Sequence, residues 1–374
     1  MHTIRLGVVA TSRKENERRL PIHPAHVASI DPAVRDQLYL ERGYGERFGF
    51  SDEQLAPYVA GLLPRHELFA RCEAVLLFKP LLQDFLDLRE GQILWGCPHF
   101  VQDEKVTQAS IDNRLSVIAL EGMLLWPDPN GYPVSICPQM GEMAGYCSVQ
   151  HALTLVGRTG AFGRPLSAAV IGYGATGRGA VASLRAQGIA DITLITRRPA
   201  GQVEAPPGVA RTAQLTAGLD AVTADGPVPL ARLLADHDVV VNCVRQDTNA
   251  PRVFLTEADI PALRPGTLVV DVSCDYGMGF SWARPTSFAE PLRGLDNNVR
   301  YYAVNHSPSY LWDSATWVLS EAVLPYLGTV LAGEAAWDAD RTVRDAVEVR
   351  HGIVTNPDIL AFQHRDAEYP HAVR

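Results

Sequence analysis

The stretch Ala168-Ala169-Val170-Ile171-Gly172-Tyr173-Gly174-Ala175-Thr176-Gly177-Arg178-Gly179-Ala180 decides the fold of this chain. An apolar run leads into a glycine-rich turn and a helical pattern follows, so we expect a buried strand, a tight turn and a helix. Gly172, Gly174 and Gly177 fill the glycine positions of G-x-G-x-x-G. These glycines permit the turn, let a pyrophosphate approach the backbone and bring the helix close to the strand. The stretch predicts a dinucleotide site that includes Ala175 and Thr176 at the helix start.

The residues on both sides of this turn support the same interpretation. The helical pattern stops at Gly188, and residues 192–196 form a second apolar strand. Strand, helix and strand together have the length of a βαβ unit. The alternative is a glycine turn in an α/β domain that binds nothing. Because the flanking pattern is complete, we favour the dinucleotide site.

The end of the second strand indicates which dinucleotide binds. NAD-binding units usually place Asp or Glu there, where the carboxylate accepts hydrogen bonds from the ribose hydroxyls. This chain instead has Thr196, Arg197 and Arg198. Guanidinium groups offer bidentate, charge-assisted donors that suit a 2′-phosphate. We therefore expect NADP (NADPH) rather than NAD as the cofactor, with two solvated loop arginines as the alternative.

The overall composition excludes several classes of protein. The chain has 374 residues, of which 47% are hydrophobic, and this is enough for two domains with separate cores. A net charge of -9 argues against a nucleic-acid partner, and no apolar run is long enough to span a bilayer. The six cysteines show neither a CxxC pair nor metal-ligand spacing. We therefore expect reduced thiols, no metal site and a cytoplasmic protein, and leave open whether it is a homo-oligomer.

The order of the patterns predicts two α/β domains. Before residue 140, apolar strands alternate with helical stretches, as in a Rossmann-like domain. A long helix of small and apolar residues is expected at about 138–156, and after about residue 300 a polar loop and another helix follow. We expect an NAD(P)-binding Rossmann domain at 141–305, inserted in a discontinuous substrate domain at 1–140 plus 306–374, with a cleft between these two Rossmann-like domains. The sequence leaves open whether the stretch 366–371 is ordered or disordered.

Several predicted strands are followed by residues with useful chemistry, at the carboxyl ends where α/β sheets place ligands. Lys79 follows the apolar strand at 74–78, and His99 follows the next one. Asn242, Cys243 and Val244 stand at the tip of a later strand and are expected near the cofactor. Taken singly, Lys79 is better explained as a surface lysine at a strand end, and His99 as a hydrogen-bonded core histidine.

The order of these features resembles the family of alanine dehydrogenase, lysine-forming saccharopine dehydrogenase and N5-(carboxyethyl)ornithine synthase, over essentially the whole chain. The matching segments are Glu17-Arg18-Arg19, Lys79, His99, Ala144-Gly145-Tyr146, the glycine turn, Asn242-Cys243-Val244, Asp271-Val272-Ser273-Cys274-Asp275 and His306-Ser307-Pro308-Ser309. The last two segments are closest to the saccharopine dehydrogenase and carboxyethylornithine synthase branches. Alanine dehydrogenase typically has an acidic residue where this chain has Arg197 and Arg198.

The resemblance implies an enzyme that reduces an imine formed between a 2-oxo acid and an amine, or that runs the reverse reaction. By position, Lys79 and His99 match the family's acid/base pair, and Arg19 matches its carboxylate-binding arginine. Asp275 matches the aspartate that lies beside the nicotinamide and the substrate. His306 and Asn305 are expected either to orient the substrate or only to close a turn.

Three functions follow as hypotheses. We favour NADPH-dependent reductive condensation of an amino acid such as ornithine or lysine with a 2-oxo acid, a CH-NH oxidoreductase reaction of the opine or saccharopine type. A saccharopine or alanine dehydrogenase that acts oxidatively with NAD is the second hypothesis. The segment 310–314 lacks the arginine of a Leu-Pro-Arg-Glu type run, which weakens the case for a second substrate carboxylate such as that of 2-oxoglutarate. The third hypothesis is a non-catalytic nucleotide-binding homologue, which would lack the acid/base pair.

Overall fold

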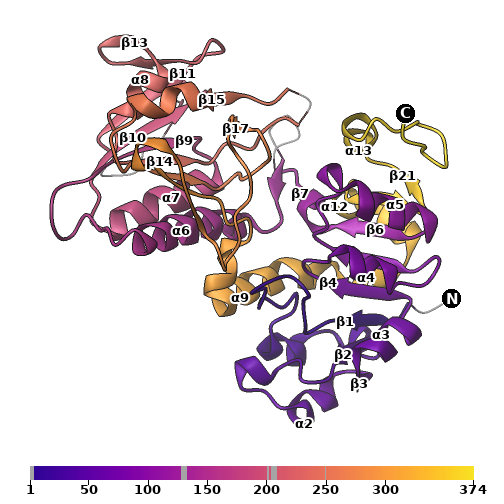
Figure 1. Cartoon of the computed structure of the whole chain (residues 1–374). Helices are drawn as coiled ribbons and strands as arrows, with labels where there is room; N and C mark the ends of the chain where they lie inside the picture. Colours follow the sequence, from indigo (N-terminus) through magenta and orange to yellow (C-terminus); the bar gives the residue numbers. More distant parts are fainter. Residues whose placement is uncertain (1–3, 128–132, 200–201, 204–208, 249) are drawn as a thin grey trace. The chain divides into compact units, whose positions relative to one another are not determined.

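The computed structural model describes residues 4–127, 133–199, 202–203, 209–248 and 250–374 (Figure 1). The chain separates into two units: unit 1 comprises Met1–Pro138 and Trp312–Arg374, and unit 2 comprises Gln139–Leu311. Unit 1 is thus built from both ends of the chain, and unit 2 is the inserted segment. Both units contain parallel sheets with helices, so the expected α/β class with two Rossmann-like domains is confirmed. Among the described residues, no helix combines the length and the apolar character needed to cross a membrane.

Unit 1 contains an eight-stranded sheet in the order β21-β20-β6-β5-β4-β1-β2-β3. Its strands are β1 (Leu6–Val8), β2 (Leu38–Glu41), β3 (Gly61–Leu63), β4 (Ala74–Leu77), β5 (Ile93–Gly96), β6 (Ser116–Ala119), β20 (Val347–Arg350) and β21 (Ile353–Val354). The first six strands pair in parallel, and the last two add antiparallel at one edge. The chain winds outward from β1 in both directions, so the switch point lies between β1 and β4.

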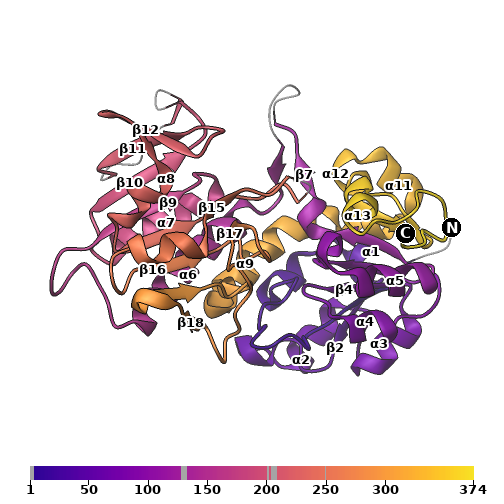
Figure 2. The same cartoon turned by 45° about the horizontal axis from the view of Figure 1, so that its top comes forward.

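The two segments of unit 1 share one core. Leu68, Val75, Leu94 and Val117 from the first segment are fully buried in one cluster with Val349 from the second. The C-terminal strand β20 pairs with β6, so the yellow segment in Figure 2 lies beside the purple sheet. The helices of this unit are α1 (Pro32–Arg35), α2 (Asp52–Leu55), α3 (Arg65–Arg71), α4 (Leu82–Leu86), α5 (Glu104–Asp112), α9 (Trp312–Val323), α10 (Leu327–Leu331), α11 (Glu334–Ala339), α12 (Arg341–Arg344) and α13 (Pro357–Phe362).

The segment 366–371, whose order the sequence left open, is held against unit 1. His371 is fully buried, and its Nε2 accepts a hydrogen bond from the Val354 N–H at 3.0 Å. Arg365, which is 5% exposed, donates to the carbonyl of His371, and its backbone forms a bridge with Val373. A buried histidine and a buried arginine thus tie this polar segment to unit 1.

Unit 2 contains a nine-stranded sheet in the order β13-β12-β11-β10-β9-β14-β16-β19-β18. Its strands are β9 (Ser167–Ile171), β10 (Asp191–Thr196), β11 (Arg211–Leu215), β12 (Asp220–Thr223), β13 (Gly226–Pro229), β14 (Val239–Asn242), β16 (Leu268–Asp271), β18 (Leu292–Gly294) and β19 (Arg300–Tyr302). Its helices are α6 (Pro138–Leu155), α7 (Ala175–Ala186) and α8 (Leu230–Ala235). A short pair of strands, β15 (Val253–Leu255) with β17 (Gly279–Phe280), also lies in unit 2. Another short pair, β7 (Leu124–Leu125) with β8 (Val134–Ser135), lies in unit 1. The central strand β9 pairs in parallel with β10 and β14. The predicted βαβ unit is therefore confirmed as β9-α7-β10.

The central strand of unit 2 is buried on both faces. Along β9, Ala168 and Val170 belong to one apolar cluster, and Ala169 and Ile171 belong to another. This alternation follows from the two-residue period of a strand, and it explains why the sequence is apolar throughout rather than alternating. The continuous apolar run at 168–171 was therefore the right signal for a doubly covered strand.

Helices α6 and α7 lie side by side on one face of this sheet (Figure 1). Their backbones approach so closely that a Cβ atom on Gly145 would lie 1.9 Å from the Thr176 carbonyl oxygen. A Cβ on Gly179 would lie 1.8 Å from the Glu142 carbonyl oxygen. Only glycine fits at both positions. The two glycines therefore allow the backbones of α6 and α7 to pack directly against each other.

A buried carboxyl group links the strand ends of unit 2. Asp271, at the end of β16, is fully buried and accepts hydrogen bonds from the Tyr301 hydroxyl at 2.8 Å and the Asn242 amide at 2.9 Å. Burial raises the pKa of Asp271 to about 6, and these hydrogen bonds only partly oppose the rise. The folded protein therefore keeps a proton on Asp271 at pH values where the unfolded chain has lost it.

We predict that this proton makes stability depend on pH. A raised pKa gives stability that is complete below the unfolded value of 3.8 and is lost as the pH rises through about 6. Asp271→Asn removes this dependence. Between pH 4.5 and 7 the unfolding free energy of the wild type should fall by about 2 kcal/mol relative to that of the variant. Urea unfolding at both pH values measures this difference.

Asp238→Asn is the matched control. Asp238 is also buried, but hydrogen bonds from Arg164 and Ser167 outweigh the effect of burial and lower its pKa to about 2. Its contribution is complete above its unfolded pKa, so the difference between wild type and this variant should stay constant from pH 4.5 to 7. A difference for Asp271→Asn that is equally constant would contradict the prediction.

Candidate active site

Unit 2 contains the predicted glycine turn between β9 and α7. Gly172 follows β9 with a φ of 91°, and a Cβ there would lie 3.0 Å from the Cys243 carbonyl oxygen. A Cβ on Gly177 would lie 2.2 Å from the Gly172 carbonyl oxygen. A Cβ on Gly174, in contrast, would meet nothing within 4 Å. The first and third glycines are thus needed by the turn itself, and the second leaves open space over the backbone.

The N-terminus of α7 leaves backbone donors for an anion. The helix begins at Ala175 and Thr176, and its N-cap residue, Gly174, makes no side-chain capping hydrogen bond. Its first turn contains no acidic residue. The first N–H groups of a helix have no partner within the helix and carry a partial positive charge. This end of α7 can therefore bind the pyrophosphate of a dinucleotide.

The basic residues after β10 lie at the glycine turn. Thr196 is buried, and its hydroxyl oxygen accepts the Arg198 N–H at 3.4 Å. The Arg198 guanidinium donates to the Tyr173 carbonyl oxygen at 2.6 Å, so it reaches across the turn between the first two glycines. Arg197 is exposed. The strand end where NAD-binding units usually carry a carboxylate is therefore basic here.

The tip of β14 touches the glycine turn through its backbone. Cys243 and Val244 contribute the atoms closest to a Cβ placed on Gly172. Asn242, however, is fully buried, and its side chain pairs with Asp271 and with the Val244 N–H at 3.2 Å. The Asn242 side chain thus holds the strand ends together, and a cofactor in this turn would meet the backbone of the two residues that follow.

The remaining expected residues of unit 2 follow β16 and β19. Asp275 is half-buried, and its charge adds to the raised pKa of Asp271. His306 is 5% exposed, and its Nδ1 lies 2.8 Å from Asn305 Oδ1. The His306 ring packs 4.6 Å from the ring of Phe288. His306 was expected in the substrate domain, but it belongs to unit 2.

In unit 1, a second group of polar residues gathers at the carboxyl edge of the sheet. The strands β4, β5 and β6 end side by side: Leu77 of β4 pairs with Gly96 of β5, and Gly96 pairs with Ala119 of β6. The segments that follow these residues therefore leave the sheet side by side. A Cβ on Gly96 would lie 2.3 Å from the Leu77 carbonyl oxygen, so a glycine is needed where the neighbouring strands end.

Lys79 and His99 meet at this edge. The Lys79 Nζ lies 2.5 Å from the His99 Nε2 and 3.3 Å from the Cys97 Sγ. Lys79 is 9% exposed, whereas the His99 side chain is 62% exposed. A contact of 2.5 Å requires a hydrogen bond, so one of the two nitrogens must act as acceptor. The pair can therefore pass a proton between a sheltered amine and an accessible imidazole.

Glu121 supports His99 from the end of β6. His99 has a φ of 54°, which is unusual for a residue other than glycine. Its N–H donates to Glu121 Oε1 at 2.6 Å, and its Nδ1 lies 3.7 Å from the same oxygen. Burial, with a smaller effect of Cys97, raises the pKa of Glu121 to about 7. This carboxyl holds the backbone of His99, and its raised pKa lets it keep a proton up to about neutral pH.

Arg19 lies in the loop after β1, and both its guanidinium and the Lys79 Nζ lie near the Phe78 ring. Its guanidinium is 4.6 Å from the centre of the Phe78 ring, and the Lys79 Nζ is 5.7 Å from the same ring. Arg19 donates from Nε at 2.8 Å and from Nη2 at 2.5 Å to the two oxygens of Glu17. Burial opposes the ionisation of Glu17, but the charge and hydrogen bonds of Arg19 outweigh it and lower its pKa. Glu17 thus fixes the plane of a buried guanidinium.

The structure therefore brings the sequence-predicted residues together in two groups. Arg19, Lys79 and His99 lie at the switch-point edge of unit 1, and the glycine turn, Arg198 and residues 243–244 lie together in unit 2. The sequence reasoning missed Cys97 and Glu121. Glu121 follows the third consecutive apolar strand just as Lys79 and His99 follow the first two, and this signal was available.

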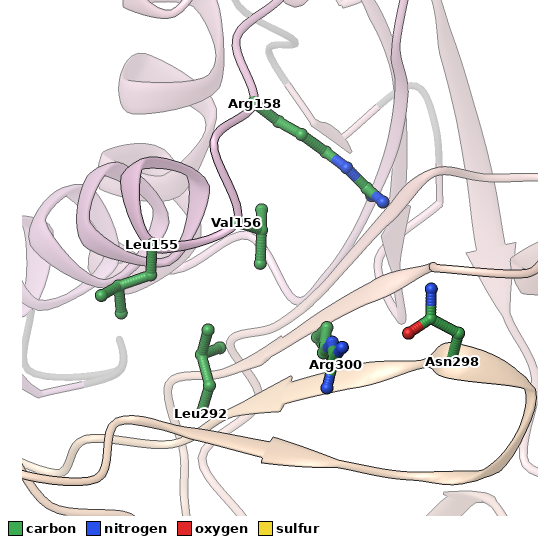
Figure 3. A pocket seen from close by; sticks show the side chains of 6 residues that line it. All are labelled: Leu155, Val156, Arg158, Leu292, Asn298 and Arg300. Carbon is green, nitrogen blue, oxygen red and sulfur yellow. The ribbon is translucent and has the colours of Figure 1, made fainter.

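The hollow in Figure 3 is a different place in unit 2. It is lined by Leu155, Val156, Arg158, Leu292, Asn298 and Arg300. Arg300 begins β19, and Arg158 donates to the carbonyl of Gly266, just before β16. This hollow thus lies at the amino ends of the strands, opposite the glycine turn, and α/β sheets bind ligands at the carboxyl ends.

The fold and the two groups of residues define a class: an α/β oxidoreductase that uses a pyridine nucleotide. Two family models agree with this class. The alanine dehydrogenase/PNT N-terminal domain matches residues 7–132, and the alanine dehydrogenase/PNT C-terminal domain matches residues 149–357. The chain belongs to the alanine dehydrogenase/PNT family, whose members bind pyridine nucleotides. The expectations of this family and of an oxidoreductase are confirmed.

Individual relatives are similar over most of the chain. An N(5)-(carboxyethyl)ornithine synthase from Clostridium botulinum is 26% identical over 82% of this chain and 89% of its own length. An alanine dehydrogenase from Lysinibacillus sphaericus is 29% identical over 84% of each chain. Among solved structures, an L-alanine dehydrogenase superposes with a TM-score of 0.76 at 20% identity, covering 96% of this chain and 99% of its own. A transhydrogenase from Sinorhizobium meliloti superposes with a TM-score of 0.71 at 18% identity, covering 94% and 99%.

We predict that the open space over Gly174 is needed by the dinucleotide. Gly174→Ala adds a methyl group that meets no protein atom within 4 Å, so the variant should keep the wild-type melting temperature. The methyl group would lie where the pyrophosphate approaches the backbone, and affinity for the dinucleotide should fall roughly tenfold or more. Isothermal titration calorimetry measures this change.

Gly328→Ala in α10 is the control, because its Cβ also meets nothing within 4 Å and it lies in unit 1. Its dinucleotide affinity should equal that of the wild type. Equal affinities of both variants would show that the dinucleotide does not approach Gly174.

Proposed function

We propose that this protein is a CH-NH oxidoreductase that joins an amino acid, such as ornithine or lysine, to a 2-oxo acid by NADPH-dependent reduction of their imine. The observation that carries the proposal is the Lys79–His99 contact beside a buried arginine. The Lys79–His99 pair could transfer protons and the arginine could bind a carboxylate, and both lie at the same edge of one sheet. The similarity to an N(5)-(carboxyethyl)ornithine synthase over 82% of the chain supports the same substrate class.

Condensation of an amine with a 2-oxo acid needs protons in a defined order. The amine must lose a proton before it attacks the carbonyl carbon, and the resulting carbinolamine must gain a proton on its hydroxyl group before water leaves. Lys79 and His99 exchange one proton across 2.5 Å, so the pair can accept the first and supply the second. The exposed imidazole gives the pair access to solvent. NADPH, when bound, supplies the hydride that reduces the imine carbon.

Arg19 is the group that we assign to the substrate carboxylate. A guanidinium pairs with carboxylates through parallel N–H donors. Glu17 already orients Arg19 through Nε and Nη2, and it balances a charge that would otherwise be buried alone. A 2-oxo acid held by Arg19 would have its carbonyl beside Phe78 and Lys79, because Arg19 and Lys79 contact the same ring.

For the residues of unit 2, we assign the 2′-phosphate to Arg197 and Arg198 and the pyrophosphate to the start of α7. Asp275 is assigned to the nicotinamide and substrate, and His306 with Asn305 to substrate orientation. Arg198 already reaches the glycine turn through the Tyr173 carbonyl. The proposal for NADPH depends on this basic strand end.

The cofactor assignment predicts a selective effect. Arg198→Gln should raise the KM for NADPH roughly tenfold or more, because a charge-assisted contact to a phosphate is lost, and it should leave the KM for NADH within about twofold. Steady-state assays with each cofactor measure both values. Arg185→Gln, an exposed arginine in the last turn of α7, is the control and should change neither. If both cofactors are weakened equally by Arg198→Gln, Arg198 supports the turn rather than the phosphate.

The acid/base assignment predicts a loss confined to turnover. Lys79→Met should lower kcat by roughly 10²–10⁴-fold, the usual effect of removing a general acid or base. Its affinity for NADPH should not change, because Lys79 belongs to unit 1. Lys105→Met, on the exposed start of α5, is the matched control and should keep full activity. Full turnover by Lys79→Met would refute the assigned role.

The reaction itself is tested by a matrix of substrates. Oxidation of NADPH, and separately of NADH, is followed with pyruvate, glyoxylate or 2-oxoglutarate, each combined with ammonia, ornithine or lysine. The proposal expects turnover with NADPH, a 2-oxo acid and an amino acid, and none with ammonia. Turnover with ammonia alone would favour an alanine dehydrogenase, a class to which the relative at 29% identity belongs. Turnover with 2-oxoglutarate, lysine and NADH would favour a saccharopine dehydrogenase.

A further inference from the structure

Cys97 has no part in the proposed reaction, yet its sulfur lies within the acid/base group. Cys97 follows β5 and is 9% exposed, and its Sγ lies 3.6 Å from the His99 Nε2. A tetrahedral zinc ion with Zn–S near 2.3 Å and Zn–N near 2.05 Å holds its sulfur and nitrogen ligands about 3.6 Å apart. The thiol and the imidazole are therefore already spaced as two ligands of one zinc ion.

Glu121 offers a third ligand. One ligand atom from each of Cys97, His99 and Glu121 lies within 4.8 Å of those of the other two. The Glu121 Oε2 is buried and has no hydrogen-bond partner among the described residues. A thiolate, an imidazole and a carboxylate are a donor set that zinc accepts, and sites with three protein ligands leave a fourth position for water or substrate.

The Lys79 side-chain nitrogen occupies the position in which such an ion would bind. Its Nζ lies 3.3 Å from the Cys97 Sγ and 2.5 Å from the His99 Nε2, the same two atoms that would coordinate the metal. Both cations use the lone pairs of these atoms, so they exclude each other. A metal at this place would also remove the imidazole nitrogen that Lys79 needs for proton exchange.

We propose that Cys97, His99 and Glu121 form a zinc site that competes with Lys79, and that Zn²⁺ bound there reversibly inhibits the enzyme. In binding, the thiol proton is replaced by the metal and leaves to solvent. The site goes beyond the sequence expectation of no metal, because its ligands come from two different strand ends. The inhibition rests on the proposed function, but the metal binding does not.

Binding is tested with Co²⁺, a spectroscopic substitute for zinc, on the full chain after treatment with EDTA and its removal. Titration should produce a thiolate-to-cobalt charge-transfer absorption that added Zn²⁺ abolishes. Cys97→Ser should lose this absorption, whereas Cys137→Ser, another buried thiol of unit 1, should keep it. Absence of the absorption in the wild type, or its persistence in Cys97→Ser, would overturn the proposal.

Two further variants keep the test decisive if Cys97→Ser folds poorly. Lys79→Met removes the competing ammonium and should tighten Co²⁺ binding roughly tenfold or more. Glu121→Gln should weaken binding but keep the absorption, because the thiolate is still present. Unchanged affinity in both variants would contradict the site.

Inhibition is measured separately. Zn²⁺ should slow NADPH oxidation by the wild type, and EDTA should restore it. Metal binding without turnover on any substrate would leave the site standing and refute the proposed function. Turnover that is insensitive to Zn²⁺, in a protein that lacks the cobalt absorption, would do the reverse.

Discussion

The contact between the Lys79 Nζ and the His99 Nε2 is the constraint on which the account of this protein rests. At 2.5 Å, the two nitrogens must share a hydrogen bond, in which one donates and the other accepts. Such a pair can move protons between its two members. Beside this contact, Glu121 accepts a hydrogen bond from the His99 N–H, and His99 adopts a left-handed backbone conformation.

The same layout recurs in both units. Each sheet is parallel at its centre and is covered by apolar clusters, so polar residues are confined to the strand ends. In unit 1 the level ends of β4, β5 and β6 gather Lys79, His99 and Glu121. In unit 2 the ends of β9, β10 and β14 gather the glycine turn, Arg198 and residues 243–244. Each group is specified by register, although its members are distant in sequence.

Much of this could be predicted from the sequence, and the exceptions have physical causes. The glycine turn and the apolar run of β9 are local patterns, so the nucleotide-binding fold was evident. The order of the tail could not be decided from the sequence, because His371 and Arg365 are polar residues buried by distant contacts. Asn242 was expected at the cofactor, but its amide is committed to Asp271, a pairing across two strands that no local pattern encodes. Cys97 was missed because its importance comes from its distances to Lys79 and His99, whereas Glu121 could have been found from its position after the next apolar strand.

The most direct test of the central claim is to follow the hydride. The enzyme is incubated with NADPH carrying two deuterium atoms at C4, together with the 2-oxo acid and amino acid that support turnover, and the products are analysed by mass spectrometry. The account predicts a secondary amine with one deuterium on the carbon that was the carbonyl carbon of the 2-oxo acid. Deuterium in a 2-hydroxy acid, or only in an amino acid formed from ammonia, would contradict it.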